Sequence, residues 1–159
     1  MKWIKYGGLF LLALLIEANF SKYYAIGNYT PDLFVILVIY ISLNEGKISG
    51  TISGFSIGLI QDFILSVGFL GLSSFSKSLS GFFVGFFTNS RRARKYPGIM
   101  IPAIIGIMVS HLFSSMFRSV GSEEGIISSV FRLSLPSAIY TFIVANFVLM
   151  ILKSEKEDE

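Results

Sequence analysis

The sequence predicts an all-α membrane protein with about six transmembrane helices and both termini in the cytoplasm. Hydrophobic residues make up 53% of the chain, only 14% of its residues are charged, and the mean hydropathy is +0.70. Soluble proteins carry roughly 25% charged residues. Polar or basic residues separate apolar runs that are long enough to form helices. These properties are typical of a polytopic membrane domain.

The composition also excludes several classes of function. Without cysteine the chain has no disulfide, thiolate metal site or thiol nucleophile, and the single His111 cannot build a multi-histidine metal site. The net charge of +3 comes from short basic clusters between apolar runs, which suit topology signals better than nucleic-acid binding. The sequence contains no nucleophile elbow, phosphate loop or paired catalytic carboxylates. We therefore expect no enzyme activity, no cofactor or metal, and no nucleic-acid partner.

The first apolar run predicts a helix from about Trp3 to Phe20. It follows Lys2 and Lys5 and so resembles the charged and hydrophobic regions of a signal peptide. Glu17 and the absence of a small-residue cleavage site favour an anchor that is not cleaved.

The second helix is predicted to begin at the motif Pro31-Asp32, with Thr30 as its cap and Pro31 at its first position. Asp32 would then face the positive end of the helix dipole. The helix would end near Asn44 and reach only about 22 Å, which is shorter than a hydrocarbon core of about 30 Å. It is therefore either shielded by its neighbours or placed where the bilayer thins.

The third helix, from about Ile48 to Leu65, carries small residues at regular spacing. Gly50, Gly54, Gly58 and Asp62 are each four residues apart, so they share one helix face, which Thr51 and Gln61 join. In a bilayer, glycines on one face let another backbone approach closely. The large apolar residues are expected on the opposite, lipid-facing side: Ile52, Ile57, Leu59, Ile60, Phe63 and Ile64.

The fourth helix, from about Phe69 to Thr88, is the predicted partner of the third. Its small and polar face contains Ser73, Lys77, Ser80, Gly81 and Gly85. We expect a tight hairpin in which Gly50, Gly54, Gly58, Gly81 and Gly85 form a helix-packing or partner face. Six large side chains would be left for lipid: Leu72, Phe75, Leu79, Phe82, Phe83 and Phe86.

Asp62 and Lys77 are the ionisable residues that lie deepest in their predicted helices, and Gln61 and Ser73 accompany them. A lone charge in the membrane costs several kcal/mol, so each should have a partner. Their depths differ by roughly 7 Å, which allows a direct ion pair without requiring one. Asp32 approaches the same outer half of the membrane from another helix. These groups either line a polar cavity for a ligand, proton or lipid head group, or fix the register of the hairpin.

Beyond the hairpin, the basic cluster Arg91, Arg92, Arg94 and Lys95 precedes a fifth helix from about Pro97 to Phe117. The cluster could be a topology signal or could bind a partner or anionic lipids. His111 is expected to hydrogen-bond to a neighbouring helix. The last apolar region, Gly125 to Leu152, predicts an interfacial segment and a sixth helix that is kinked near Pro136. Residues 1–152 would form one polytopic domain, and residues 153–159 a disordered acidic cytoplasmic tail.

The orientation follows from the basic residues in the loops. If the amino terminus is cytoplasmic, the inner side contains nine of the twelve loop lysines and arginines and the outer side contains three. The inner nine are Lys2, Lys5, Lys47, Arg91, Arg92, Arg94, Lys95, Lys153 and Lys156, and the outer three are Lys22, Arg118 and Arg132. Six helices satisfy this arrangement, whereas five would place the tail outside.

Several of these segments form one ordered series between residues 31 and 87. The series is Pro31-Asp32-Leu33-Phe34, Asn44-Glu45-Gly46, the glycine–aspartate helix, Gly68-x-Leu70-Gly71-Leu72, and Gly81-x3-Gly85. In order and spacing it resembles the MreD family, small multi-span proteins of the bacterial rod-shape system, or elongasome.

The resemblance implies a non-enzymatic scaffold in the bacterial cytoplasmic (inner) membrane that binds MreC and membrane lipids. Through MreC it would join MreB, RodA and a class B penicillin-binding protein in lateral peptidoglycan synthesis. MreD is also similar in fold to the substrate-binding S components of energy-coupling-factor vitamin transporters. That similarity supplies the alternative function, in which Asp62 and Lys77 would line a vitamin pocket.

Overall fold

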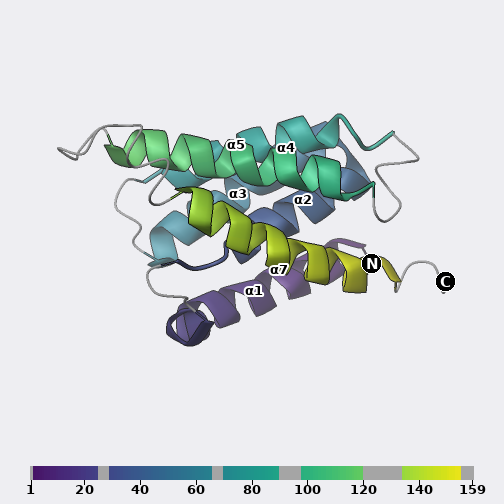
Figure 1. The fold of residues 1–159 in the computed structure, drawn as a ribbon. Helices are drawn as coiled ribbons and strands as arrows, with labels where there is room; N and C mark the ends of the chain where they lie inside the picture. Colours follow the sequence, from purple (N-terminus) through teal and green to yellow (C-terminus); the bar gives the residue numbers. More distant parts are fainter. Residues whose placement is uncertain (1, 25–28, 66–69, 90–97, 120–133, 155–159) are drawn as a thin grey trace.

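The computed structural model describes residues 2–24, 29–65, 70–89, 98–119 and 134–154. Within these ranges the chain is all-helical, as predicted (Figure 1). The helices are α1 (Lys2–Tyr24), α2 (Leu33–Glu45), α3 (Lys47–Leu65), α4 (Leu72–Gly85), α5 (Met100–Ser119) and α7 (Leu135–Ser154).

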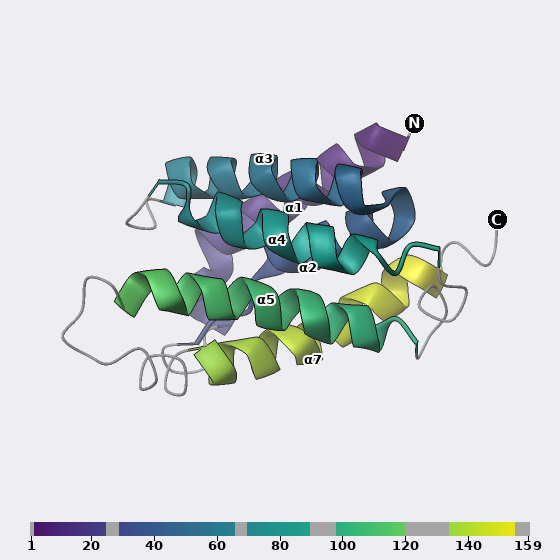
Figure 2. The same ribbon diagram turned by 90° about the horizontal axis from the view of Figure 1, so that it is seen from above.

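Successive described helices run in alternate directions through one bundle. Figures 1 and 2 both place the start of α1 at the same end of the bundle as the end of α7. The turn between α2 and α3 lies at this end too, and Gly46 adopts a positive φ of 93° there. A residue with a side chain rarely adopts this backbone conformation, so the short connection depends on glycine.

Helix α2 lies at the centre of the bundle. Every residue from Phe34 to Leu43 is buried, and α1, α3, α4, α5 and α7 all pack against it. At 1.5 Å per residue, this helix is about 20 Å long. Of the two interpretations of its short length, the structure supports shielding by neighbouring helices.

The core around α2 is apolar, but several polar side chains are buried in it and large apolar side chains cover the surface of the bundle. Ser42, Ser76, Ser80 and Thr141 are fully buried, and Lys77 is only 2% exposed. Large apolar side chains point outward from all the helices around α2. Soluble proteins bury such residues and expose lysine, whereas a bilayer solvates the apolar side chains. Examples are Leu11 and Leu15 on α1, Ile52 and Phe63 on α3, Phe83 on α4 and Phe86 directly after it, Ile101 on α5, and Ile143 and Phe147 on α7.

Among the described residues, one helix is by itself long and apolar enough to cross a membrane. It is the Leu135–Leu152 part of α7, with a mean hydropathy of 2.0. The apolar stretches Leu33–Glu45 of α2 and Met100–Met116 of α5 are shorter. The prediction of six spans therefore stays a prediction.

The predicted start of the second helix is wrong by two residues. Asp32, rather than Thr30, is the N-cap of α2, and its side chain accepts a hydrogen bond from the Val35 amide at 3.0 Å. Pro31 is buried and precedes the cap. Asp32 has extended backbone angles (φ −88°, ψ 96°), and its carboxylate accepts a capping hydrogen bond, so the helix begins after Asp32.

The other predictions about helix ends and faces have different outcomes. Pro136 lies in the first turn of α7, and the interfacial segment predicted before it lies outside the described residues, so the kink between the two stays a prediction. Helix α7 continues to Ser154, and the division into a domain of residues 1–152 and a tail of residues 153–159 also stays a prediction. Ile57 and Leu72, expected to face lipid, are each 7% exposed, because their helices contact α2 as well as each other.

Candidate functional site

Helices α3 and α4 pack backbone to backbone along the predicted glycine face. Gly50 lies against Gly81, Gly54 against Lys77, and Gly58 against Ser73, so each step of four along α3 matches a step of four back along α4. A Cβ atom added to Gly58 would lie 2.5 Å from the Ser73 carbonyl carbon. One added to Gly85 would meet the backbone of Lys47. The hairpin therefore needs glycine at these positions for steric reasons.

This packing also shows what covers the glycine face. Gly50, Gly54 and Gly58 all contact α4, and Gly50 also contacts Ser42 of α2. The face is thus filled from within the chain. A partner helix would have to bind elsewhere on the surface.

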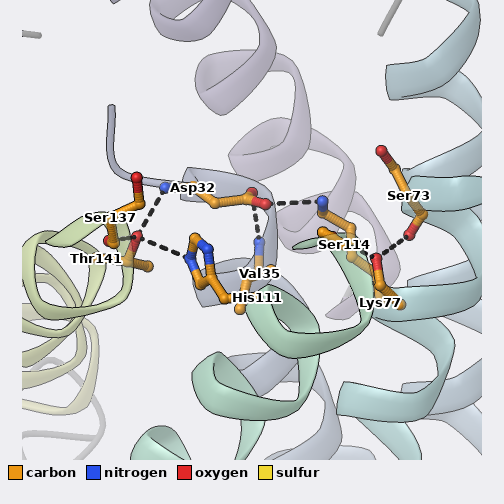
Figure 3. A network of polar contacts seen from close by, with 9 residues as sticks. Asp32, Val35, Ser73, Lys77, His111, Ser114, Ser137 and Thr141 are labelled. Atoms are coloured by element: carbon orange, nitrogen blue, oxygen red, sulfur yellow. Dashed lines mark hydrogen bonds and ion pairs between the residues drawn. The ribbon is translucent and has the colours of Figure 1, made fainter. Parts of the chain in front are cut away.

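Lys77 extends from α4 to the start of α2, where its Nζ atom forms a salt bridge of 2.8 Å with Asp32 Oδ2 (Figure 3). The Lys77 side chain is 3% exposed and the Asp32 side chain 20%. The other carboxylate oxygen of Asp32, Oδ1, accepts the capping bond from Val35. Asp32 therefore stabilises the first turn of α2 and neutralises the buried lysine at the same time.

Thr141 joins α7 to this cluster. The Asp32 amide donates to Thr141 Oγ1 at 3.1 Å, and Thr141 Oγ1 donates to the Ser137 carbonyl at 2.7 Å. His111 Nε2, from α5, lies 3.3 Å from the same hydroxyl oxygen. Because the single hydroxyl proton is used on Ser137, the His111 contact requires a proton on Nε2. The three contacts together place a proton on His111 Nε2.

A serine pair adds a second connection between α4 and α5. Ser114 Oγ donates to Ser76 Oγ at 3.3 Å, and Ser76 Oγ donates to the Ser73 carbonyl at 3.3 Å (Figure 3). Ser73 is thus part of the α4 side of this contact, with its carbonyl group beside Gly58. Together the polar contacts join α2, α4, α5 and α7 at one level of the bundle.

Asp62 does not pair with Lys77. Its Oδ2 atom accepts a hydrogen bond from the Gly71 amide at 2.8 Å, and its Oδ1 atom is buried without a hydrogen-bond partner. Gly71 has a φ of 95° and precedes the first turn of α4. Neighbouring Gln61 is 7% exposed, and its Oε1 atom also lacks a hydrogen-bond partner. The structure therefore places Asp62 and Gln61 at the end of the hairpin, separate from the lysine.

The choice of Asp32 as the lysine's partner is what sequence reasoning missed. The signal was present, because Asp32 and Asp62 both enter the outer half of the bundle and a lysine side chain is long enough to reach either. For Glu17 of α1 the expected partner was Lys22, whose side chain lies outside the described residues, and the structure brings Glu17 near the charges of Asp32 and Lys77. Its Oε2 atom is buried and has no hydrogen-bond partner.

The remaining predicted residues lie away from this cluster. The basic residues Arg91, Arg92, Arg94 and Lys95 are outside the described parts of the chain. At the end of the bundle where the chain begins, Tyr6 donates to Glu45 at 2.9 Å and Thr88 donates to the Ser42 carbonyl at 2.7 Å. No three metal-ligating side chains gather within the described ranges. The arrangement of the ionic and hydroxyl groups is therefore that of contacts between helices.

Comparison with known proteins adds an independent result. The family described as rod shape-determining protein MreD matches residues 1–154. Searches of curated proteins and of solved structures give no match. The family match includes the glycine hairpin, the Asp32–Lys77 pair and α7, and it covers almost the whole chain. The chain therefore belongs to the MreD family of rod shape-determining membrane proteins.

Proposed function

We propose that this chain is a non-enzymatic scaffold of the rod-shape machinery that binds MreC directly. Family membership gives the role in rod shape determination. The proposal adds that the chain helps to organise lateral peptidoglycan synthesis, in one assembly with MreB, RodA and a class B penicillin-binding protein. The observation that supports a scaffold best is that its buried ion pair and hydroxyl groups tie helices together.

We place the protein in the bacterial inner membrane as a single multi-pass domain of about six spans. The outward-facing apolar side chains support a membrane setting. Figure 1 supports two termini on one side, because the start of α1 and the end of α7 lie at the same end of the bundle. The excess of basic residues assigns that end to the cytoplasm.

The orientation can be tested cleanly because the chain has no cysteine. Asn89 and Thr30 are exposed residues that follow α4 and precede α2, and so mark opposite ends of the bundle. In intact cells, a membrane-impermeant maleimide should label Thr30→Cys and should label Asn89→Cys only after the membrane is opened. The reverse pattern would invert the proposed topology.

The partner surface must lie on the outer faces of the helices, because α4 already covers the glycine face. A photo-crosslinking amino acid can be placed at one exposed position per helix. Suitable positions are Leu12 on α1, Phe55 on α3, Phe83 on α4, Ile104 on α5 and Phe147 on α7. The position that captures MreC identifies the face, and we expect one face to do so while the others crosslink to lipid.

The function itself is tested by a crosslinked pull-down from native membranes, followed by identification of the recovered proteins. Recovery of MreC with RodA or a class B penicillin-binding protein is the expected result. Recovery of an ATPase pair and its membrane coupling subunit, without MreC, would contradict the scaffold. A Gly7→Ala variant serves as a control and should recover the same proteins as the unaltered chain, because a Cβ atom at Gly7 would meet nothing within 4 Å.

A further inference from the structure

A groove lies between α5 and α7. Its volume is about 170 Å³, and the described residues that line it are all apolar. Ile104, Ile107 and Met108 contribute from α5, and the segment from Leu135 to Phe142 contributes from α7. This segment covers two turns of α7, or about 10 Å at 1.5 Å per residue. The groove is therefore elongated along the helices.

The floor of the groove belongs to the core, whereas its rims reach the surface. Ile107 and Ala138 are 1% and 5% exposed, but Ile104, Met108 and Ile139 range from 36% to 60% exposed. On the inner side, the contact between His111 and Thr141 holds α5 and α7 together. The two helices thus meet inside the bundle and leave a gap at its outer surface.

The chemistry of the lining limits what can fill this gap. Ordered water needs two to four polar partners, and the lining offers none. A transmembrane helix of a partner packs best against small residues. The glycine of α5, Gly106, faces Val84 and Ile39 in the core, and the rims of the groove are large side chains. A flexible unbranched hydrocarbon chain fits both the elongated shape and the apolar rims.

We propose that this groove binds one acyl chain of a phospholipid from the surrounding bilayer. The proposal rests on the membrane placement given above and goes beyond it, because it distinguishes a defined lipid position from general lipid contact. The acyl chain lies between Ile104 and Met108 on one side and Ile139 on the other, with Ala138 beneath it. Burial of its methylene groups against these side chains holds it there.

The test uses the full chain in vesicles of phosphatidylethanolamine and phosphatidylglycerol that include a phosphatidylethanolamine with a diazirine in its acyl chain. After illumination, mass spectrometry locates the adducts. We expect a several-fold enrichment of adducts on 104–108 and 135–142 relative to Phe55 and Phe63, which are 53% and 67% exposed on the surface of α3. Equal labelling of both faces would overturn the proposal. Absence of adducts on every face would overturn the membrane placement as well.

Two variants narrow the groove in different ways. Ala138→Leu fills its floor, and Ile139→Phe narrows its mouth from an exposed position that does not disturb the core. Both should reduce groove adducts several-fold and leave α3 adducts unchanged, and Ile52→Phe on α3 is the matched control. Unchanged groove adducts in a folded Ile139→Phe protein would contradict the proposal. So would a photo-crosslinker at Ile139 that captures a protein, rather than lipid, in native membranes.

Discussion

Asp32 and Lys77 are 45 residues apart in the sequence, and their side chains form a salt bridge of 2.8 Å inside the bundle. The same carboxylate caps α2, so the pair connects the central helix to the glycine hairpin. Removal of one partner from a buried ion pair leaves an unpaired charge, which costs more than the pair contributes when complete. The consequences of this pairing can be measured.

Lys77→Met should destabilise the protein by about 3–5 kcal/mol, because Asp32 then remains buried without a cation. The double variant Asp32→Asn with Lys77→Met should recover much of this loss, since asparagine keeps the capping oxygen and no charge remains. Thermal unfolding in detergent micelles measures both. If the double variant is instead destabilised by the sum of the Asp32→Asn and Lys77→Met effects, the two residues are not energetically coupled.

Gly54→Ala should lower stability by about 1–3 kcal/mol, because the added methyl group meets the Lys77 carbonyl in a closely packed interface. Gly7→Ala adds the same methyl group to a helix where nothing lies within 4 Å, so its effect should be neutral or slightly favourable. Thermal unfolding should separate the two variants, and so should co-purification of MreC if the proposed binding to MreC holds. Equal stability of both would show that α3 and α4 can move apart at no cost.

Asp62→Ala should cost about 1–3 kcal/mol, because the Gly71 amide loses its acceptor at the end of the hairpin. Asp62→Asn retains a carbonyl oxygen that can accept the same bond and should be much milder. Limited proteolysis between α3 and α4 reports on this connection directly. Identical behaviour of the two variants would mean that the charge of Asp62, rather than this hydrogen bond, matters.

Nitrogen NMR should find His111 protonated at Nε2, the tautomer that its contact with Thr141 requires. The chain contains only this histidine, so the signal needs no assignment. Thr141→Val should change the tautomer ratio and destabilise the protein by about 1 kcal/mol, whereas Thr141→Ser keeps the hydroxyl and should change neither. An Nε2 atom without a proton in the unaltered protein would contradict the network.

The glycine hairpin could be predicted from the sequence because its cause is local. Glycines four residues apart on one helix require close packing, and a matching small face followed after one turn. The partner of Lys77 could not be predicted in this way, because it depends on the level along α4 at which α2 begins. Asp32 sets that level as the N-cap of α2, and the predicted start of α2 was two residues too early.

The lipid-facing residues, too, could be predicted only in part. Periodicity separates one face of a helix from the other, and it correctly placed Ile52, Phe63, Phe83 and Phe86 at the surface. Periodicity does not show whether a helix packs against a second neighbouring helix, so the burial of Ile57 and Leu72 was not predicted. The start of α1 and the end of α7 lie at the same end of the bundle (Figure 2), and the cytoplasmic location of both termini stays a prediction from the basic residues.

The enclosure of α2 has a consequence for how the protein is made. This helix emerges second from the ribosome, yet two of the helices that surround it, α5 and α7, are synthesised last. Until α4 is present, Asp32 also has no lysine to neutralise it. A 13-residue helix that carries an uncompensated carboxylate is poorly suited to stand alone in lipid. The membrane insertion machinery should therefore retain α2 and release it together with the later helices.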